Sequence, residues 1–274
     1  MNTVFITDLD HTFLRSDLSI SPYSRRIWNG AAAQNTLTIA TARSFKKSEE
    51  FMKNLHVNAP MILLDGSLIV SQSRQIIESK FIDKELGDAV IDIGATLGAF
   101  PFVLALQDAN LNEAFLYPMQ RNRYQHKLLE RYRGDDNLRE AAHIRAMDEN
   151  FKLVYMGEET MLQELQVRLQ ESFGDALKYI LAPEAYMGCH FLTLLHPHAD
   201  KAHGLQIVSE YLGRSVSEVT VFGDNLNDLG MFEKAGTSVA VRNAHDEVKA
   251  RADIVLEHSN DEDGVAKYLE REGA

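Results

Sequence analysis

The sequence is poor in cysteine and in basic residues, and each shortage excludes a class of function. Cys189 is the single cysteine among 274 residues, so no disulfide can form within the chain and a sulfur-rich metal site is excluded. The 28 Lys and Arg residues face 40 Asp and Glu residues, which gives a formal net charge of -12. Because nucleic acids and anionic membranes are held mainly by Lys and Arg, we expect neither as a partner.

Long hydrophobic runs are also missing. The longest apolar stretch, residues 89–106, is interrupted by Asp92, two glycines and Pro101, which a bilayer would tolerate poorly. Residues 1–6 have no basic region or cleavage site, and Asp8 follows too soon for a signal peptide. Together with the single cysteine, this pattern predicts a soluble protein of the reducing cytoplasm. We also expect a monomer or a weak homodimer.

At both ends of the chain, short apolar runs typical of buried strands alternate with helix-like segments. The runs are 4–7, 37–40, 61–64, 219–222, 238–241 and 254–256, and the helix-like segments are 21–33, 44–55, 201–212, 226–235 and 244–251. This alternation predicts an α/β fold with a Rossmann-like parallel sheet that helices cover on both faces.

The middle of the chain has a different pattern. After a predicted hairpin at 67–77, extended candidates at 102–106, 114–117, 152–156, 177–181 and 191–195 are separated by helices near 121–133 and 160–172. We therefore predict one domain from 1–82 and 190–274, with residues 83–189 inserted as a separate α+β domain.

The first chemical motif is Asp8-Leu9-Asp10-His11-Thr12, directly after an apolar run. In an open α/β sheet, the loops at the carboxyl ends of the strands form the ligand site, so both carboxylates would lie there. The alternative is a turn with a helix cap, for which Asp and Thr are favoured. The pattern D-x-D-x-T occurs by chance in about one chain in twenty of this length, so it is only suggestive alone.

A second motif, Gly223-Asp224-Asn225-Leu226-Asn227-Asp228, also follows a predicted strand. The alternative is again a purely structural role, because Gly-Asp-Asn is favoured in turns and at helix caps. Both motifs at strand ends in one chain are expected by chance roughly once in several thousand chains. The pair therefore favours a functional site.

Two further segments complete the set. Thr41-Ala42-Arg43 follows a predicted strand, and Lys201 begins a predicted helix. Alone, such a Thr is usually a cap and such a Lys a surface charge. In this order, however, the chain supplies a nucleophile, a neutral donor, a cation and an acidic cluster, the groups that phosphoryl transfer requires.

These four motifs resemble, in order, those of the haloacid dehalogenase superfamily of phosphohydrolases, within the Cof-type or sugar-phosphatase-like group. The resemblance is strong over 1–82 and 190–274, and it implies a hydrolase core with a large C2-type cap inserted between the motif at Thr41 and the motif at Lys201. Three positions depart from the common pattern: Ala42 replaces a frequent Gly, Asp65-Gly66 a frequent Asn-Gly, and His11 a frequent Gly.

The resemblance also implies roles. Asp8 is the nucleophile, and Asp10 protonates the leaving group and later activates water. The implied cofactor is Mg²⁺, bound by the carboxylates of Asp8 and Asp224 and the backbone carbonyl of Asp10, all hard oxygen ligands. Asp228 would orient a metal-bound water or Lys201.

Phosphate would be held by the Thr41 hydroxyl, the Ala42 amide, Lys201 and the Asn227 amide. Arg43 would reach either substrate or a carboxylate of the cap. Other histidines, His190, His196, His198 and His203, lack a familiar zinc spacing and are expected to lie on the surface or in loops.

The expected activity is hydrolysis of a small phosphomonoester. Sugar phosphates are the first candidates, followed by phosphorylated vitamins such as pyridoxal phosphate and by small nucleotides. Two alternatives stay open: a phosphohexomutase of the same superfamily, and a module that binds a phosphorylated ligand without turnover.

Overall fold

The chain divides into two compact units. In the computed structural model, which describes residues 2–184 and 187–272, one unit contains Met1–Ser79 and Ala199–Ala274 and the other contains Lys80–His198. The second unit is thus inserted into the first. Residues 80–82 and 190–198, expected in the first domain, belong to the second unit. The Ile82 N–H donates to the Asn150 carbonyl of that unit, and strand β11 (Cys189–Leu195) pairs with two of its strands. The parts of the predicted domains at 1, 185–186 and 273–274 lie outside the described residues.

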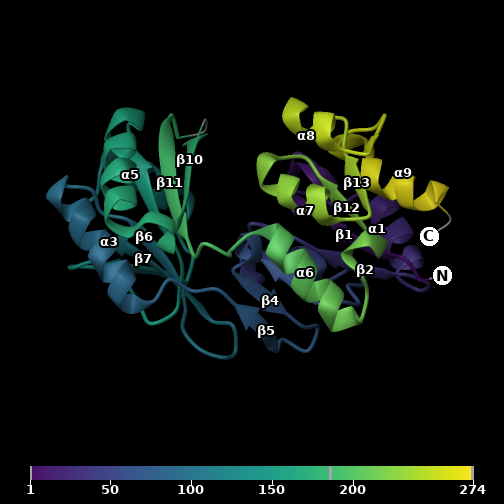
Figure 1. The fold of residues 1–274 in the computed structure, drawn as a ribbon, viewed down its shortest axis with the longest axis horizontal. Coiled ribbons are helices and arrows are strands. Elements are labelled where there is room, and N and C mark those ends of the chain that lie inside the picture. The colour runs from purple at the N-terminus through teal and green to yellow at the C-terminus, as the bar shows by residue number, and fades with distance from the viewer. Residues whose placement is uncertain (1, 185–186, 273–274) are drawn as a thin grey trace. The chain divides into compact units, whose positions relative to one another are not determined.

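The first unit is built on a parallel sheet whose strand order is β14-β13-β12-β1-β2 (Figure 1). Each neighbouring pair of strands is parallel, which confirms the α/β class predicted from the alternation of strands and helices. The strands are β1 (Val4–Thr7), β2 (Thr36–Ile39), β12 (Val219–Gly223), β13 (Thr237–Ala240) and β14 (Ile254–Val255).

A small antiparallel sheet lies beside the main one. Its strands are β3 (Met61–Leu63), β4 (Leu68–Val70) and β5 (Ile76–Ser79). The predicted hairpin forms β4 and β5, whereas the predicted strand 61–64 joins the parallel sheet only through a bridge between Ala40 and Ile62.

Helices of the first unit begin where the sequence supplies caps. Ser21, Ser44 and Asp200 each accept a backbone N–H bond at the start of a helix. The helices are α1 (Pro22–Ala31), α2 (Phe45–Met52), α6 (Lys201–Leu212), α7 (Leu229–Lys234), α8 (Asp246–Arg251) and α9 (Gly264–Arg271). Helix α9, which the sequence did not predict, packs against α1, and its Tyr268 ring meets Phe222 edge-on.

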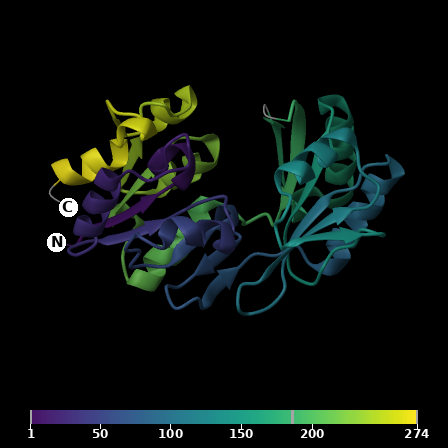
Figure 2. The ribbon, with the colours of Figure 1, turned by 180° about the vertical axis from the view of Figure 1, so that it is seen from behind.

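The second unit has a six-stranded sheet of order β10-β11-β9-β6-β7-β8, antiparallel except for the parallel pair β7 and β8. Its elements are α3 (Lys84–Thr96), β6 (Phe102–Leu106), β7 (Glu113–Pro118), α4 (Arg123–Arg131), β8 (Leu138–Ala141), β9 (Asn150–Gly157), α5 (Glu159–Phe173), β10 (Lys178–Glu184) and β11. Helices α3 and α5 cover one face of this sheet and α4 the other (Figures 1 and 2).

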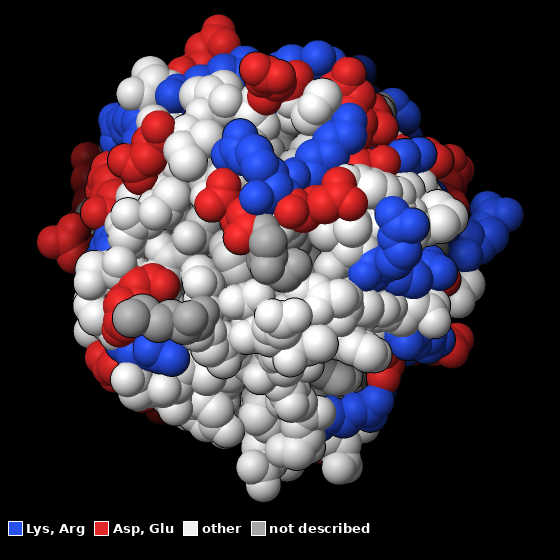
Figure 3. Space-filling view, turned by 90° about the vertical axis from the view of Figure 1, so that its right-hand side faces the viewer, with Lys and Arg blue, Asp and Glu red and all other residues white. Residues whose placement is uncertain are grey.

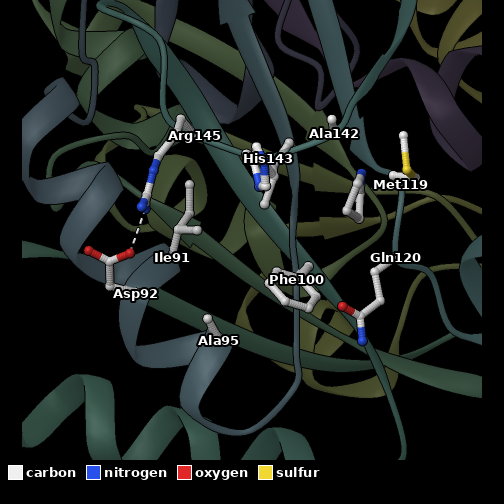
Figure 4. A pocket seen from close by; sticks show the side chains of 11 residues that line it. Ile91, Asp92, Ala95, Phe100, Met119, Gln120, Ala142, His143 and Arg145 are labelled. Carbon is white, nitrogen blue, oxygen red and sulfur yellow. Dashed lines mark hydrogen bonds and ion pairs between the residues drawn. The ribbon is translucent and has the colours of Figure 1, made fainter.

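A cavity of about 270 Å³ opens within the second unit, among side chains from α3, the end of β7 and residues 142–145. Figure 4 shows Phe100, His143 and Gln120 around it, and shows Arg145 directed to Asp92. These two charged groups pair at 2.5 Å, so together they add no net charge to the cavity.

On the face drawn in Figure 3, basic and acidic side chains are interspersed. Within residues 2–184 and 187–272, no helix is both long enough and apolar enough to cross a bilayer.

Candidate active site

Three neighbouring strands of the parallel sheet bring the motifs to one edge. The Asp8 N–H donates to the Phe222 carbonyl at 3.0 Å, so the residues after β1 start beside the end of β12. On the other side of β1, the Ala40 N–H donates to the Thr7 carbonyl at 2.9 Å, which places Thr41 just beyond β2. The two acidic motifs and Thr41 therefore share the carboxyl edge of the sheet, as predicted for a site in an open α/β fold.

Lys201 joins the two acidic motifs. Its Nζ donates to Asp8 Oδ1 at 2.6 Å and to Asp228 Oδ1 at 2.7 Å. The side chains of Lys201 and Asp228 are 0% exposed and that of Asp8 is 7% exposed. Ions this deeply buried are tolerated only when they are paired and hydrogen-bonded, so the three groups depend on one another.

The environment shifts the pKa values of this cluster. Burial lowers the pKa of Lys201, but attraction by Asp228 and Asp8 outweighs burial, so the net shift is upward and the amine stays protonated. Burial raises the pKa of Asp8 well above its usual range; Lys201 opposes this shift, and the Asp228 and Asp224 carboxylates add to it. Burial and the Asp228 carboxylate raise the pKa of Asp224 to about 6.

A divalent cation fits this cluster. Asp8, Asp224 and Asp228 each present a carboxylate oxygen, and these oxygens lie within 4.8 Å of one another. Burial is the main cause of the raised pKa values of Asp8 and Asp224, and repulsion among the carboxylates adds to it, so a bound cation would favour their ionised forms. Oxygen ligands suit Mg²⁺.

The hydrogen bonds of Asp228 and Asp224 indicate different roles for these two residues. Asp228 Oδ1 accepts from Lys201, and Oδ2 accepts from the backbone N–H groups of Asp224 and Asn225 at 3.0 and 3.1 Å. Asp228 is therefore occupied on both oxygens, which suits an orienting residue better than a metal ligand. The Thr12 hydroxyl donates to Asp224 Oδ1 at 3.0 Å, which orients that carboxylate. Thr12 lies in the first motif, but no role was predicted for it from the sequence.

Asp10 and Arg43 form a pair that the sequence did not predict. Arg43 Nε donates to Asp10 Oδ2 at 2.8 Å, and Nη2 donates to Oδ1 at 2.5 Å. The guanidinium also lies over the Phe51 ring, 4.7 Å from its centroid. Arg43 thus binds the expected acid/base residue, and its contact with substrate or a cap carboxylate stays a prediction.

The predicted phosphate-binding groups lie around these acids. Thr41 is buried, and its Oγ1 accepts the Arg43 N–H at 3.1 Å, which leaves its hydroxyl hydrogen available to donate. Ala42 is exposed between them. Asn227 Nδ2 donates to Asp65 Oδ1 at 2.9 Å. Asp65 was not among the predicted site residues, although an Asp-Gly pair directly after a strand was visible in the sequence.

The four histidines have other partners. His203 Nε2 lies 2.7 Å from Glu78 Oε2, His196 Nδ1 accepts the His198 N–H at 3.1 Å, and His190 Nε2 lies 3.7 Å from Glu159 Oε2. The group of potential metal ligands found among the described residues contains only aspartates.

Comparison with known proteins places the chain in a family. The sequence matches the haloacid dehalogenase-like hydrolase family over residues 5–269, and the chain belongs to that family. It is 27% identical to a putative phosphatase of Haemophilus influenzae, with 98% of each chain covered. It is 24% identical to a 5-amino-6-(5-phospho-D-ribitylamino)uracil phosphatase of Bacillus subtilis, with 96% of each covered. The family and the hydrolase class predicted from the four motifs are confirmed.

Solved structures agree on the fold. A haloacid dehalogenase-like hydrolase from Bacteroides thetaiotaomicron superposes with a TM-score of 0.82 at 24% identity, covering 99% of both chains. A Thermotoga maritima protein superposes with a TM-score of 0.77 at 25% identity, covering 99% of this chain and 97% of the other. The likeness extends through both units, so the predicted fold class is confirmed.

Proposed function

We propose that this hydrolase is a Mg²⁺-dependent phosphatase that cleaves a small phosphomonoester, with sugar phosphates as the first candidates, through an aspartyl-phosphate on Asp8. The phosphatase class is shared with named relatives, which include an HMP-PP phosphatase of Cronobacter sakazakii that is 24% identical over 96% of this chain and 92% of its own. The observation that carries the proposal is the bridge from Lys201 to Asp8 and Asp228, 2.6 and 2.7 Å long, beside Asp224.

In the first step, an oxygen of Asp8 attacks phosphorus and the bond to the leaving oxygen breaks. To act as an acid, Asp10 carries a proton on one carboxyl oxygen in place of one Arg43 contact. Asp10 gives this proton to the leaving oxygen, so an alcohol leaves instead of an alkoxide. When bound by Asp8, Asp224 and the Asp10 carbonyl, Mg²⁺ supplies positive charge against the phosphoryl group.

Four groups would hold the phosphoryl oxygens while charge shifts among them. The Thr41 hydroxyl, the Ala42 N–H and the Asn227 amide are neutral donors, and Lys201 is the cation. Lys201 is already fixed by two carboxylates, so it needs little reorganisation when the phosphoryl group arrives.

In the second step, Asp10 takes a proton from water, the water oxygen attacks phosphorus, and phosphate leaves as Asp8 is regenerated. The inserted unit, residues 80–198, is proposed as the cap that selects the substrate and excludes water. As part of the same proposal, the enzyme works in the cytoplasm as a monomer or weak homodimer, without nucleic-acid or membrane partners.

A panel of phosphate esters tests this proposal. The purified chain should release phosphate from at least one sugar phosphate with Mg²⁺, and chelation should stop the release. Asp8→Asn, which keeps the shape of the side chain but removes the nucleophile, should be inactive while still folded. Release by Asp8→Asn at the wild-type rate, or full activity without metal, would disprove the site. Conversion of one sugar phosphate to its isomer without free phosphate would identify a mutase instead.

A further inference from the structure

A strained turn lies beside the phosphate-binding segments. Leu64, Asp65 and Gly66 follow β3 with φ values of 51°, 55° and 91°, so three successive residues occupy the left-handed region. Residues with a side chain are strained in that region, although Asp tolerates it better than most. Strain of this kind persists only where neighbouring contacts hold it, and it is common at functional sites.

The contacts that hold this turn come from the segments proposed to bind phosphate. The Asp65 N–H donates to the Thr41 carbonyl at 3.0 Å, and the Leu64 N–H donates to the Arg43 carbonyl at 3.0 Å. Gly66 packs against Asp200, the residue before Lys201, so closely that a Cβ there would lie 2.1 Å from the Asp200 carbonyl oxygen. The turn is therefore fixed between the Thr41-Ala42-Arg43 segment and Asp200, the residue before Lys201.

The Asp65 side chain reaches Asn227, in the Gly223–Asp228 motif. Its Oδ1 accepts a hydrogen bond from Asn227 Nδ2 at 2.9 Å. Its charge also acts on Lys201, whose pKa is lowered by burial but raised more strongly by Asp228, Asp8 and Asp65. Asp65 thus hydrogen-bonds Thr41 and Asn227 and acts electrostatically on Lys201, so it interacts with every segment proposed to hold the phosphoryl group.

We propose that Asp65 is a positioning residue of the phosphate site: its carboxylate fixes the Asn227 amide, and its negative charge weakens the retention of free phosphate. This inference rests on the proposed phosphatase function. The Asn227 amide has two N–H donors, so one can bind Asp65 while the other is presented to a phosphoryl oxygen.

The size of the charge effect follows from distance. A phosphoryl oxygen on the same amide nitrogen would lie two hydrogen bonds from the carboxylate, about 5–6 Å away. Two negative charges at this separation, in a partly exposed site, change a dissociation constant by roughly tenfold. Phosphate is the last product to leave, so the repulsion favours turnover by lowering product inhibition.

Two variants separate the positioning effect from the charge effect. Asp65→Asn removes the charge, keeps an oxygen that accepts the Asn227 hydrogen bond, and suits a φ of 55°. Asp65→Gly removes the same charge and the acceptor, and also allows this backbone conformation. Because both variants lack the carboxylate charge, any difference between them reports the positioning of Asn227.

The measurements are the inhibition constant of inorganic phosphate, its direct binding by calorimetry with Mg²⁺, and KM and kcat with p-nitrophenyl phosphate. Asp65→Asn should bind phosphate roughly tenfold more tightly than the wild type and lower KM by the same factor. Asp65→Gly should bind phosphate several-fold more weakly than Asp65→Asn. In an Asn227→Ala background, the difference between the Asn and Gly variants should disappear.

Phosphate binding by Asp65→Asn that is equal to or weaker than wild type would overturn the charge effect. Equal binding by the Asn and Gly variants, with matching unfolding midpoints, would overturn the positioning effect. Either of these two results would be obtained with a wild-type enzyme that is active. A wild type that neither binds phosphate nor cleaves any ester would instead disprove the proposed function, and this inference with it.

Discussion

Arg43 donates to both carboxylate oxygens of Asp10, from Nε at 2.8 Å and from Nη2 at 2.5 Å. A bidentate pair of this kind fixes the plane of a carboxylate as well as its position. Arg43 is itself fixed, because its backbone bonds Thr41 and its guanidinium lies over Phe51. The residue proposed as acid and base is therefore held in place by the motif that follows the neighbouring strand.

Arg43→Lys should separate orientation from charge. Lysine keeps the positive charge but cannot form the bidentate hydrogen bonds, so Asp10 should be less well oriented. We expect kcat to fall about tenfold with a sugar phosphate, which needs its leaving group protonated, and much less with p-nitrophenyl phosphate. Steady-state kinetics with both esters checks this. Arg25→Lys, an exposed change on α1, is the control, and equal loss with both esters would contradict the orienting role.

Lys201→Met should destabilise the fold. The variant keeps an unbranched side chain of similar length but leaves Asp8 and Asp228 buried without their cation. Breaking such a pair costs about 3 kcal/mol of unfolding free energy, and added Mg²⁺ should restore part of it by supplying positive charge. Urea unfolding with and without Mg²⁺ measures both effects. Lys53→Met, at an exposed position, is the matched control; a loss no larger than in this control would contradict the mutual dependence of the buried ions.

The sequence was sufficient to predict the residues that lie at strand ends. Asp8, Thr41 and Asp224 could be predicted because parallel strands end at one edge of a sheet, whatever the details of packing. The pairing of Arg43 with Asp10 could not be predicted, because the partner of a long side chain depends on tertiary distances that no local pattern encodes. The same is true of Asp65, whose contact with Asn227 joins residues far apart in the chain.

Helix α3 (Lys84–Thr96), strand β8 and helix α9 were not predicted from the sequence, and the last two have weak local signals. Strand β8, Leu138–Ala141, is a short edge strand with a largely polar sequence, so it lacks the apolar run that marks a buried strand. Helix α9 begins at Gly264 after Asp263 with a φ of 61°, and no side chain caps it. Its position is instead determined by packing against α1, a tertiary contact.

The stability of the metal-free chain should depend on pH through Asp224. Its pKa is raised from 3.8 to about 6 by burial and by the Asp228 carboxylate. Between these values the folded chain holds a proton that the unfolded chain has lost, so the unfolding free energy falls as pH rises through this window. Mg²⁺ binds the ionised form, so its stabilising effect should be small near pH 5 and larger near pH 7.

Thermal unfolding with chelator and with Mg²⁺ at several pH values measures the competition between the proton and Mg²⁺ for the Asp224 carboxylate. Asp224→Asn cannot lose a proton at this position, so its stability in chelator should depend less on pH and Mg²⁺ should stabilise it less at neutral pH. A Mg²⁺-induced shift of the unfolding midpoint that is identical at all pH values would contradict the assignment of Asp224 as a ligand.

Asp10→Asn should behave differently with different leaving groups. A sugar alkoxide needs a proton, so the first step should fail and neither alcohol nor phosphate should appear at an appreciable rate. Nitrophenolate leaves without a proton, so Asp8 should still be phosphorylated from p-nitrophenyl phosphate with Mg²⁺, but the second step then lacks its base. Rapid mixing should therefore show a burst of about one equivalent of nitrophenol per active site, followed by slow turnover as the covalent intermediate accumulates. Equal slowing with both esters and no burst would mean that Asp10 supports the loop or the metal, and that another group moves the proton.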